Sequence, residues 1–257
     1  MNSVLRVLII SVVVFGITQG KAVFPATAGQ QSRLAYADGL FMKRSDKTKA
    51  AAALNIYRDV LKSNPGDAEA AWRVSMACYF VGFEVSKDNS EKKKMFAEGR
   101  DAGIASLALN AGSAQANFWT GVNMALYGQT TGVVKMLFTV PGVRGYLIRS
   151  AAIDPSYAYG GAYRILGKID QELPGILGGS NKAAKDYYEK AINAAPDEPL
   201  NYLFMADLVL KTDRDRLKAL DFAYKGLALP EPDESRHESK WALTKLKEFV
   251  KVNSYTK

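Results

Sequence analysis

The sequence has few of the residues that carry catalytic and metal chemistry. Its 257 residues include one cysteine, Cys78, and one histidine, His237. A lone cysteine excludes an internal disulfide, so the core alone must hold the protein together. Cys78 lies among apolar residues, which predicts a buried thiol that packs as a small hydrophobic group. His237 lies in the polar stretch 232–237, which is expected to form a solvated turn. No metal site and no cofactor are therefore expected.

Phosphate-binding and nucleophile motifs are also missing. The glycine pair at 178–179 lacks the lysine and the spacing of a phosphate loop, and Ser180 lacks the strand–turn–helix setting of a nucleophile elbow. Two carboxylates can run a glycosidase, and Glu84 stands out in the apolar run YFVGFEV. A buried acid, however, usually has a basic partner. We therefore expect a protein that is not an enzyme, with a carboxylate-dependent cell-wall hydrolase that uses Glu84 as the alternative.

Acidic residues are fewer than basic ones, and the formal net charge is +8. A basic balance can indicate nucleic-acid binding, but here the basic residues are spread over many segments, with one short run at 92–94. This spread is typical of solvated helix faces, so no nucleic-acid partner is expected.

The only long apolar run is at the N-terminus, at residues 7–17. It is shorter than the ~20 residues of a membrane span. Arg6 precedes it, and the small residues Ala26-Thr27-Ala28 follow it, which is the pattern of a cleaved secretory signal. We predict a signal peptide at residues 1–28 and a periplasmic or secreted mature chain; an uncleaved anchor is the alternative. No cysteine follows the run to carry a lipid.

The rest of the chain contains a recurring order of small and large residues. A small residue, a tyrosine, a small or medium apolar residue and a proline follow one another at spacings of four, three and five in two places: Ala53, Tyr57, Val60 and Pro65, and Ala184, Tyr188, Ala191 and Pro196. This is the order of tetratricopeptide repeats, in which small residues let two helices approach and the aromatic ring fills the space beside them. Residues 29–257 are therefore predicted to form one all-α domain, an α–α superhelix of degenerate tetratricopeptide-like hairpins with about eleven or twelve helices.

Two regions depart from that order. In the expected helix at 91–110 the repeat positions are all small, namely Gly99, Gly103 and Ser106. Residues 128–142 are apolar but interrupted by Gly132 and Pro141, which predicts a short helix at 133–138 and a separate helix at 143–153. This insertion would cover an opening, make an oligomer contact or bury itself in the core.

One block resembles a known family. Within residues 151–206, a glycine pair precedes Arg164, a Leu-Pro-Gly loop follows at 173–175, and a second glycine pair precedes a helix that ends at Pro196. This block resembles the T-component associated with TRAP transporters. The resemblance implies a periplasmic, all-helical protein that partners a solute-binding protein, forms a trimer and offers a cavity to a hydrophobic or organic-acid ligand. Members are often lipoproteins; without the cysteine, this chain would be soluble or held by its partner.

Candidate ligand contacts come from the expected concave face: Trp119, Asn123, Tyr163 and Arg164. Arg164 follows a stretch of small and aromatic residues, where an arginine could bind a carboxylate bidentately. The alternative is a structural salt bridge with Glu84, Asp170 or Glu172. The expected function is that of a periplasmic helical-repeat scaffold that binds a partner protein, with a small ligand as an additional candidate. A generic envelope-assembly adaptor is a further alternative.

Overall fold

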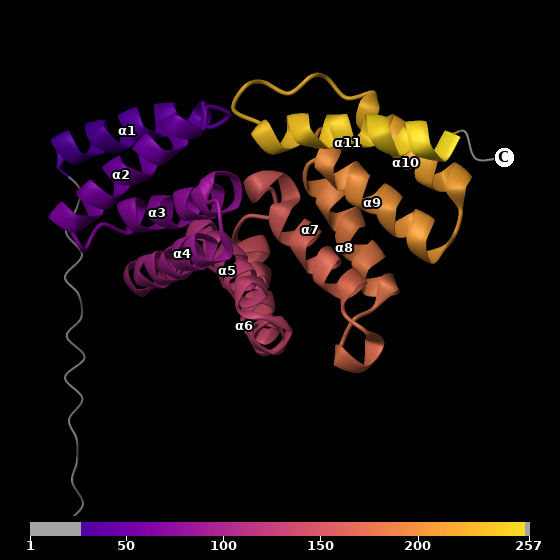
Figure 1. Cartoon of the computed structure of the whole chain (residues 1–257), viewed down its shortest axis with the longest axis horizontal. Coiled ribbons are helices and arrows are strands. Elements are labelled where there is room, and N and C mark those ends of the chain that lie inside the picture. Colours follow the sequence, from indigo (N-terminus) through magenta and orange to yellow (C-terminus); the bar gives the residue numbers. More distant parts are fainter. Residues whose placement is uncertain (1–26, 255–257) are drawn as a thin grey trace, which may run out of the picture.

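The computed structural model describes residues 27–254, and within them every regular element is a helix (Figure 1). The all-α prediction is confirmed for this part of the chain. The eleven α-helices are α1 (Ala28–Met42), α2 (Lys47–Ser63), α3 (Ala68–Phe80), α4 (Asn89–Leu109), α5 (Ala114–Thr131), α6 (Val133–Ile153), α7 (Tyr157–Glu172), α8 (Asn181–Ala194), α9 (Pro199–Thr212), α10 (Arg216–Leu227) and α11 (His237–Ser254). A π-helical turn, η1 (Val81–Val85), extends α3, and a 3₁₀ turn, η2 (Gly175–Leu177), lies between α7 and α8.

Short polar side chains define where most helices begin. An aspartate or serine at the N-cap accepts a hydrogen bond from a free amide of the first turn at Asp46, Asp67, Asp88, Ser113, Ser180 and Asp215. Each such cap contributes about 1 kcal/mol of helix stability. The caps are spaced along the chain so that helix follows helix with short connections, which favours antiparallel neighbours.

The two hairpins with the recurring residue order pack alike. Tyr57 of α2 and Tyr188 of α8 are both fully buried. The Tyr57 hydroxyl donates to Asp38 Oδ1 of α1 at 2.7 Å, and the Tyr188 hydroxyl donates to Gln171 Oε1 of α7 at 2.7 Å. In each hairpin the tyrosine therefore fills the space against the preceding helix and bonds a polar side chain of that helix.

The helices stack into a curved array with an inner and an outer row. From α3 onward, each odd-numbered helix contacts the next odd-numbered one as well as its chain neighbours, whereas the main contacts of α6, α8 and α10 are with their neighbours in the chain. Helices on the inside of a curve lie closer together than those on the outside. Therefore α3, α5, α7, α9 and α11 form the inner row, and α4, α6, α8 and α10 form the outer row.

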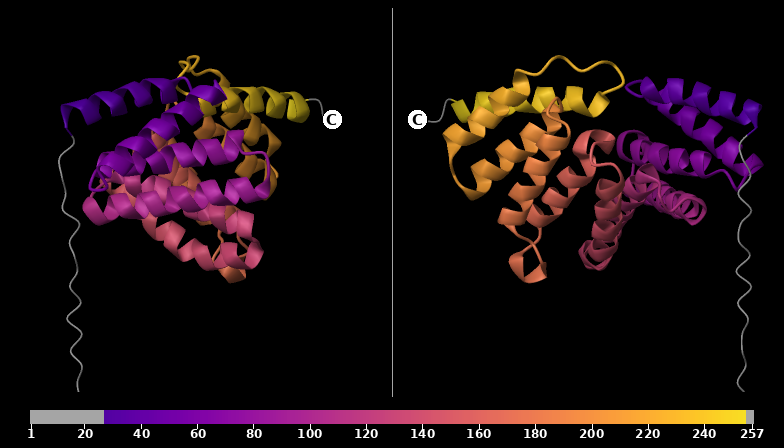
Figure 2. Two further views of the ribbon diagram at one scale, coloured as in Figure 1. Left: turned by 60° about the vertical axis from the view of Figure 1, so that its left-hand side comes forward. Right: turned by 180° about the vertical axis from the view of Figure 1, so that it is seen from behind.

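The two ends of the array meet (Figures 1 and 2). The guanidinium of Arg44, which follows α1, pairs with Glu238 of α11. His237 bonds Ser45 Oγ through Nδ1 at 3.1 Å, and its ring lies edge-on to Phe80 with centroids 5.5 Å apart. The expectation of a solvated turn at His237 is therefore wrong. The polar stretch continues only to Arg236, and His237 begins α11 in a half-buried contact that the sequence does not reveal.

Of the two interruptions predicted in residues 128–142, the one at Gly132 is confirmed and the one at Pro141 is wrong. Gly132 has a φ of 123° and separates α5 from α6. α6 runs without interruption from Val133 to Ile153 with Pro141 inside it. Packing against α5 holds this segment in place: a Cβ at Gly128 would lie 2.6 Å from Thr139 Oγ1, and one at Gly142 would lie 3.1 Å from Met124 Sδ. The close α5–α6 contact that these glycines allow offsets the hydrogen bond lost at the proline.

The predicted signal peptide falls on residues 1–26, outside the described part, and on Thr27 and Ala28. Thr27 caps α1: its hydroxyl accepts from the Gln30 amide at 3.3 Å, and Gln30 Oε1 accepts from the Thr27 amide at 2.8 Å. Cleavage before Gly29 would remove this capping box. None of the helices described here combines the length and apolarity needed to cross a bilayer.

Candidate functional site

Aromatic rings from α3, η1, α5 and α7 form a connected strip on the inner row. Tyr79 stacks on Phe83 with ring centroids 6.1 Å apart and lies against Trp119 at 5.2 Å. The Trp119 indole Nε1 donates to the Tyr157 hydroxyl at 2.7 Å. Phe83 is 55% exposed, while the other three rings are half-buried. The strip is therefore a rigid apolar surface with one ring open to solvent.

Of the four residues predicted to contact a ligand, Trp119 belongs to this aromatic strip and Asn123 does not. Asn123 is fully buried, and its Nδ2 donates to the Ser75 carbonyl and to the Trp119 carbonyl, both at 2.9 Å. A Cβ at Gly99 would lie 2.5 Å from Asn123 Oδ1, so the amide occupies the space that the glycine leaves. Asn123 joins three helices and offers no surface to a ligand in this conformation.

Tyr163 makes its ring contact outside the aromatic strip. It is half-buried, and its ring stacks on Tyr187 of α8 with centroids 6.4 Å apart. The structure thus brings Tyr163 to the α7–α8 contact.

Arg164 is half-buried on α7, and polar acceptors hold its guanidinium. Nη1 donates to Asn201 Oδ1 at 2.5 Å and to the Tyr159 carbonyl at 3.1 Å, and Nη2 donates to the Ala158 carbonyl at 3.4 Å. Burial lowers the pKa of Arg164, because a low-dielectric surrounding disfavours the charged form. The hydrogen bonds therefore fix the guanidinium in place, although its burial disfavours the charged form.

The expected salt bridge of Arg164 is wrong, since each acid proposed for it has another partner. Glu84 pairs with Lys47 at 3.4 Å, Asp170 with Arg144 at 2.8 Å and Glu172 with Lys168 at 2.7 Å. Among residues 27–254, no carboxylate lies within ion-pair distance of Arg164. The pairing of Glu84 with Lys47 confirms the expectation that this acid has a basic partner.

Two of the three acceptors of Arg164, the carbonyls of Ala158 and Tyr159, belong to a strained turn that the sequence did not predict. Ala158, Tyr159 and Gly160 have φ values of 52°, 56° and 74°, so three consecutive residues are left-handed. For non-glycine residues this conformation costs on the order of 1 kcal/mol each. Gly160 is needed here, because a Cβ would lie 2.8 Å from the Ala191 carbonyl oxygen. Asn201 Nδ2 also donates to the Tyr159 carbonyl, at 3.2 Å, so the strained turn and Arg164 share one polar network.

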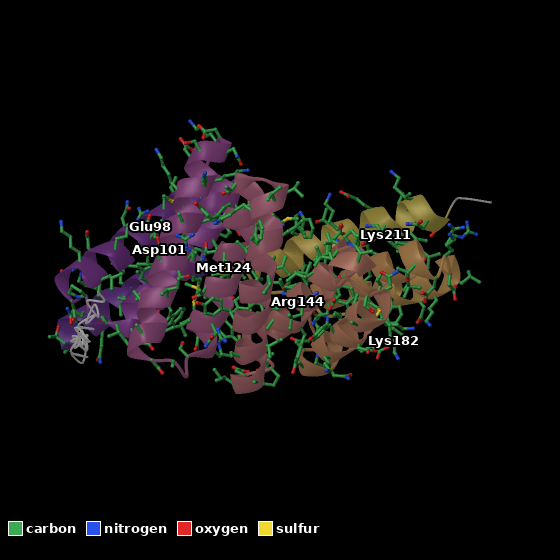
Figure 3. All side chains as sticks on the ribbon, turned by 90° about the horizontal axis from the view of Figure 1, so that it is seen from below. Glu98, Asp101, Met124, Arg144, Lys182 and Lys211 are labelled. Carbon is green, nitrogen blue, oxygen red and sulfur yellow. The ribbon has the colours of Figure 1, made fainter. Side chains whose placement is uncertain are left out.

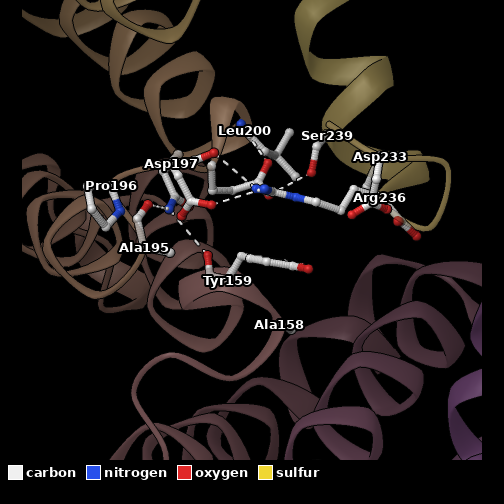
Figure 4. Close-up of polar contacts among 12 residues, drawn as sticks. Ala158, Tyr159, Ala195, Pro196, Asp197, Leu200, Asp233, Arg236 and Ser239 are labelled. Atoms are coloured by element: carbon white, nitrogen blue, oxygen red, sulfur yellow. Dashed lines mark hydrogen bonds and ion pairs between the residues drawn. The ribbon is translucent and has the colours of Figure 1, made fainter. Parts of the chain in front are cut away.

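A second polar cluster lies beside this turn and joins α11 to the start of α9 (Figure 4). Glu198 is 2% exposed; its Oε1 accepts from the Leu200 amide, and its Oε2 accepts from Arg236 at 3.0 Å and Ser239 at 2.7 Å. The Arg236 guanidinium lies 4.3 Å from the centre of the Tyr159 ring. The sequence shows Glu198 only as one acid in a polar turn, so its burial could not be foreseen. This cluster fixes α11 relative to the strained turn.

Further along the inner row, an open groove of about 550 Å³ lies between α7, α9 and α11. Its walls combine aromatic rings and charged groups, including Lys168, Phe204, Asp207, Trp241, Lys245 and Phe249. Trp241 is 50% exposed. The inner row thus presents a second apolar surface with a charged rim.

Comparison with known proteins places the chain in a family. The family described as regulator of microtubule dynamics protein 1-3 matches residues 33–168, more than half of the chain. The chain belongs to this family. The matched range includes Trp119, Asn123, Tyr163 and Arg164, and it ends within α7, so α8–α11 lie beyond it. No curated protein matches the chain significantly.

Solved structures confirm the tetratricopeptide-like fold. TTC0263, a thermophilic TPR protein of Thermus thermophilus, is similar with a TM-score of 0.60 and 18% identity over 84% of this chain and 99% of its own. PilF of Pseudomonas aeruginosa gives a TM-score of 0.55 and 16% identity over 89% and 95%. PilW, a type IV pilus biogenesis factor, gives 0.53 and 17% over 90% and 97%. At these identities the likeness concerns the fold alone.

Proposed function

We propose that the chain is a non-enzymatic scaffold whose inner row binds a segment of a partner protein. The observation that carries this proposal is the aromatic strip of Tyr79, Phe83 and Trp119, which lies on the same row of helices as an arginine without a carboxylate partner among residues 27–254. Aromatic residues and arginine dominate the energetic centres of protein interfaces. Packing and the Trp119–Tyr157 hydrogen bond already hold the rings of the strip in place. Binding should therefore cost little side-chain conformational entropy.

Arg164 is proposed to bind a carboxylate of that segment. Two other arginines show how this chain uses the Nε–Nη2 edge of the guanidinium: Arg58 donates to both oxygens of Glu98 at 2.6 Å, and Arg73 donates through the same edge to Asp38. In Arg164 the only contact of this edge within residues 27–254 is the 3.4 Å bond from Nη2. A bidentate carboxylate would supply the missing counter-charge.

The compartment decides which partner the inner row meets. The sequence predicts export, and the TRAP-like block implies the solute-binding protein of an uptake system, assembled with a trimer of this chain. An organic-acid ligand would use the same Arg164 edge. The matched family is named for the regulation of microtubule dynamics, and an exported chain cannot meet a cytoskeletal polymer. We propose the periplasmic partner, and cell fractionation of the native protein tests the compartment first.

Site-specific photo-crosslinking tests the binding surface. A crosslinking amino acid is placed at Phe83 or Trp241 on the inner row, and at Leu217 or Tyr224 on α10 of the outer row as matched exposed controls. The inner positions are expected to yield one discrete adduct in cells, identified by mass spectrometry as a solute-binding protein, and the outer positions none. Equal adducts from both rows, or none from either, would exclude the inner row as the binding surface.

A second arm tests Arg164 itself. Arg164→Ala is expected to weaken the adduct at Phe83 at least tenfold, since a charge-assisted bidentate pair contributes about 1.5–3 kcal/mol. Arg149→Ala is the control, because Arg149 also lacks an ion pair among the described residues but lies on the outer row. If the adduct survives Arg164→Ala unchanged, the carboxylate assignment is wrong while the scaffold proposal stands. Native mass spectrometry of the captured complex also tests the trimer.

A further inference from the structure

The first half of α6 projects from the array and is unusually apolar. None of residues 133–142 is buried; the buried residues of this helix begin at Val143. Val133 and Val134 are each 70% exposed, and Phe138 is 79% exposed. Together with Thr131, Gly132 and Lys135, these side chains line a shallow hollow. Such a patch is costly in water unless something covers it.

A second apolar tip lies on the same side of the molecule. Ile176 and Leu177 of η2 are 94% and 47% exposed. Because α5, α6, α7 and α8 run alternately down and up, the α5–α6 turn and the α7–α8 connection lie at the same end of their helices. In Figures 1 and 2 both tips form the lower edge of the molecule in every view. We call these two segments, residues 131–138 and 175–177, the apolar tips.

Basic side chains outnumber acidic ones around the apolar tips. The start of α4 lies beside the first tip, where Asn89 Nδ2 donates to the Thr130 carbonyl at 2.9 Å, and it carries Lys87 and the basic run at 92–94 together with Asp88 and Glu91. No aspartate or glutamate occurs between Asp101 and Asp154, whereas Lys135 and Arg144 lie in that interval. Arg149 also lies there, but it bonds Asn117 near the start of α5, at the other end of the α5–α6 hairpin. Residues 173–185 contain Lys182 and Lys185 and no acid. Figure 3 views the molecule from this side and shows Arg144 of α6 and Lys182 of α8.

The acids nearest in sequence to the η2 tip are already paired. Asp170 is bound by Arg144 at 2.8 Å, and Glu172 by Lys168 at 2.7 Å. The surroundings of the two apolar tips therefore combine exposed aliphatic and aromatic side chains with an excess of basic side chains.

We propose that this side of the molecule docks on an anionic membrane surface, with the apolar tips inserted at the headgroup level and Lys135 and Lys182 facing lipid phosphates. Protruding aliphatic and aromatic side chains flanked by lysines are the combination that binds such interfaces. A symmetric contact with a second copy would bring the same excess of basic side chains together from both sides, which is unfavourable. The docking is independent of the inner row and leaves it free for a partner protein.

An environment-sensitive dye placed on single cysteines tests the docking. The native Cys78 is fully buried, and burial raises the pKa of its thiol, so it does not compete for the dye. The dye is attached at Phe138→Cys, at Ile176→Cys, or at Leu217→Cys on α10 as the exposed control. With vesicles of equal parts phosphatidylglycerol and phosphatidylcholine, emission at 138 and 176 is expected to rise several-fold, and a lipid-phase quencher should reduce it. The dye at 217 should not respond.

This position-specific measurement separates docking by the apolar tips from tethering by the apolar run at residues 7–17, because a tether alone leaves the dye at 176 in water. Lys135→Gln and Lys182→Gln are each expected to weaken partitioning onto the anionic vesicles about fivefold, while pure phosphatidylcholine binds weakly in every case. An unchanged spectrum at both tips would overturn the proposal. A spectral change that appears without vesicles and grows with protein concentration would also overturn it and would assign the surface to a second copy of the chain.

Discussion

The helices α8 and α4 occupy equivalent places in their hairpins but fill them in opposite ways. In α8, Tyr188 inserts a fully buried ring against α7, where a Cβ at Gly167 would lie 2.5 Å from it. In α4 the equivalent position is Gly103, and the space is taken by Thr120 of α5 and Ser75 of α3. One hairpin is held by a large apolar side chain, and the other by close backbone approach with small polar groups.

The difference shows that two helices of a hairpin can be packed together either by a buried tyrosine between small residues or by glycines and small polar side chains. Around α4, buried hydroxyls and amides bond carbonyls of neighbouring helices: Ser106 Oγ donates to the Ala68 carbonyl at 2.9 Å, and Asn123 Nδ2 donates to the Ser75 carbonyl at 2.9 Å. Around α4 these hydrogen bonds take the place of a buried apolar ring, and they form only when the neighbouring helices lie at the right distance. The α8 hairpin should therefore be sensitive to truncation, and the α4 hairpin to enlargement.

The largest effect is expected from removing the ring at α8. Tyr188→Ala deletes a fully buried ring and leaves a cavity beside Gly167, which should lower the free energy of unfolding by about 4 kcal/mol. Urea denaturation followed by circular dichroism measures it. Tyr187→Ala is the control, since that neighbouring ring is half-buried and should cost much less. Equal losses for the two variants would mean that the ring at 188 is not what holds this hairpin.

Enlarging α4 should have the next largest effect. Gly103→Ala places a methyl group against Thr120 Oγ1 and within 3.0 Å of Ser75 Oγ, so we expect a loss of about 2 kcal/mol even though alanine favours helices. In Gly39→Ala, where nothing lies within 4 Å of the new methyl group, the same change should stabilise the chain by up to about 1 kcal/mol.

A double variant checks the cause. Gly103→Ala combined with Thr120→Ala removes the hydroxyl that the methyl group meets, so part of the loss should return. If the double variant is no more stable than Gly103→Ala alone, the close approach of α4 to α5 is not the source of the cost.

This comparison also explains how far the sequence predicts the fold. The spacing at 53–65 and at 184–196 was sufficient to predict the two regular hairpins, because a tyrosine between small residues leaves few other ways to pack. At 91–110 the small residues showed only that the order had degenerated. Thr120 and Asn123 make their polar contacts with residues of other helices. The spacing of residues within one helix does not show which helices will pack together, so these contacts could not be predicted. The continuous α6 was missed for the same reason, since contacts with α5 outweigh Pro141.

The candidate site was predictable only in part. Arg164 is conspicuous in the sequence because it follows a stretch of small and aromatic residues, and Trp119 was named as part of the expected concave face. That either residue contacts a ligand stays a prediction. Neither the direction of Arg164 nor its acceptors could follow from sequence, since they depend on a left-handed turn at 158–160 and on Asn201, 37 residues away. Closure of the array through His237 and Arg44 joins residues nearly 200 positions apart and leaves no local pattern.

The smallest effect is expected from removing the tyrosine hydroxyls of the two hairpins that keep the repeat order, and its size should differ between the two hairpins. Tyr57→Phe and Tyr188→Phe each keep the ring and remove one buried hydrogen bond, which should cost about 1 kcal/mol. Asp38 keeps its bonds from Arg73 when the Tyr57 hydroxyl is lost, whereas Gln171 Oε1 has no second donor among the described residues. The cost at 188 should therefore exceed the cost at 57 by several tenths of a kcal/mol, measured as a difference in urea midpoint at constant slope. The reverse order would show that the charged Asp38 depends on its tyrosine more than the neutral Gln171 does.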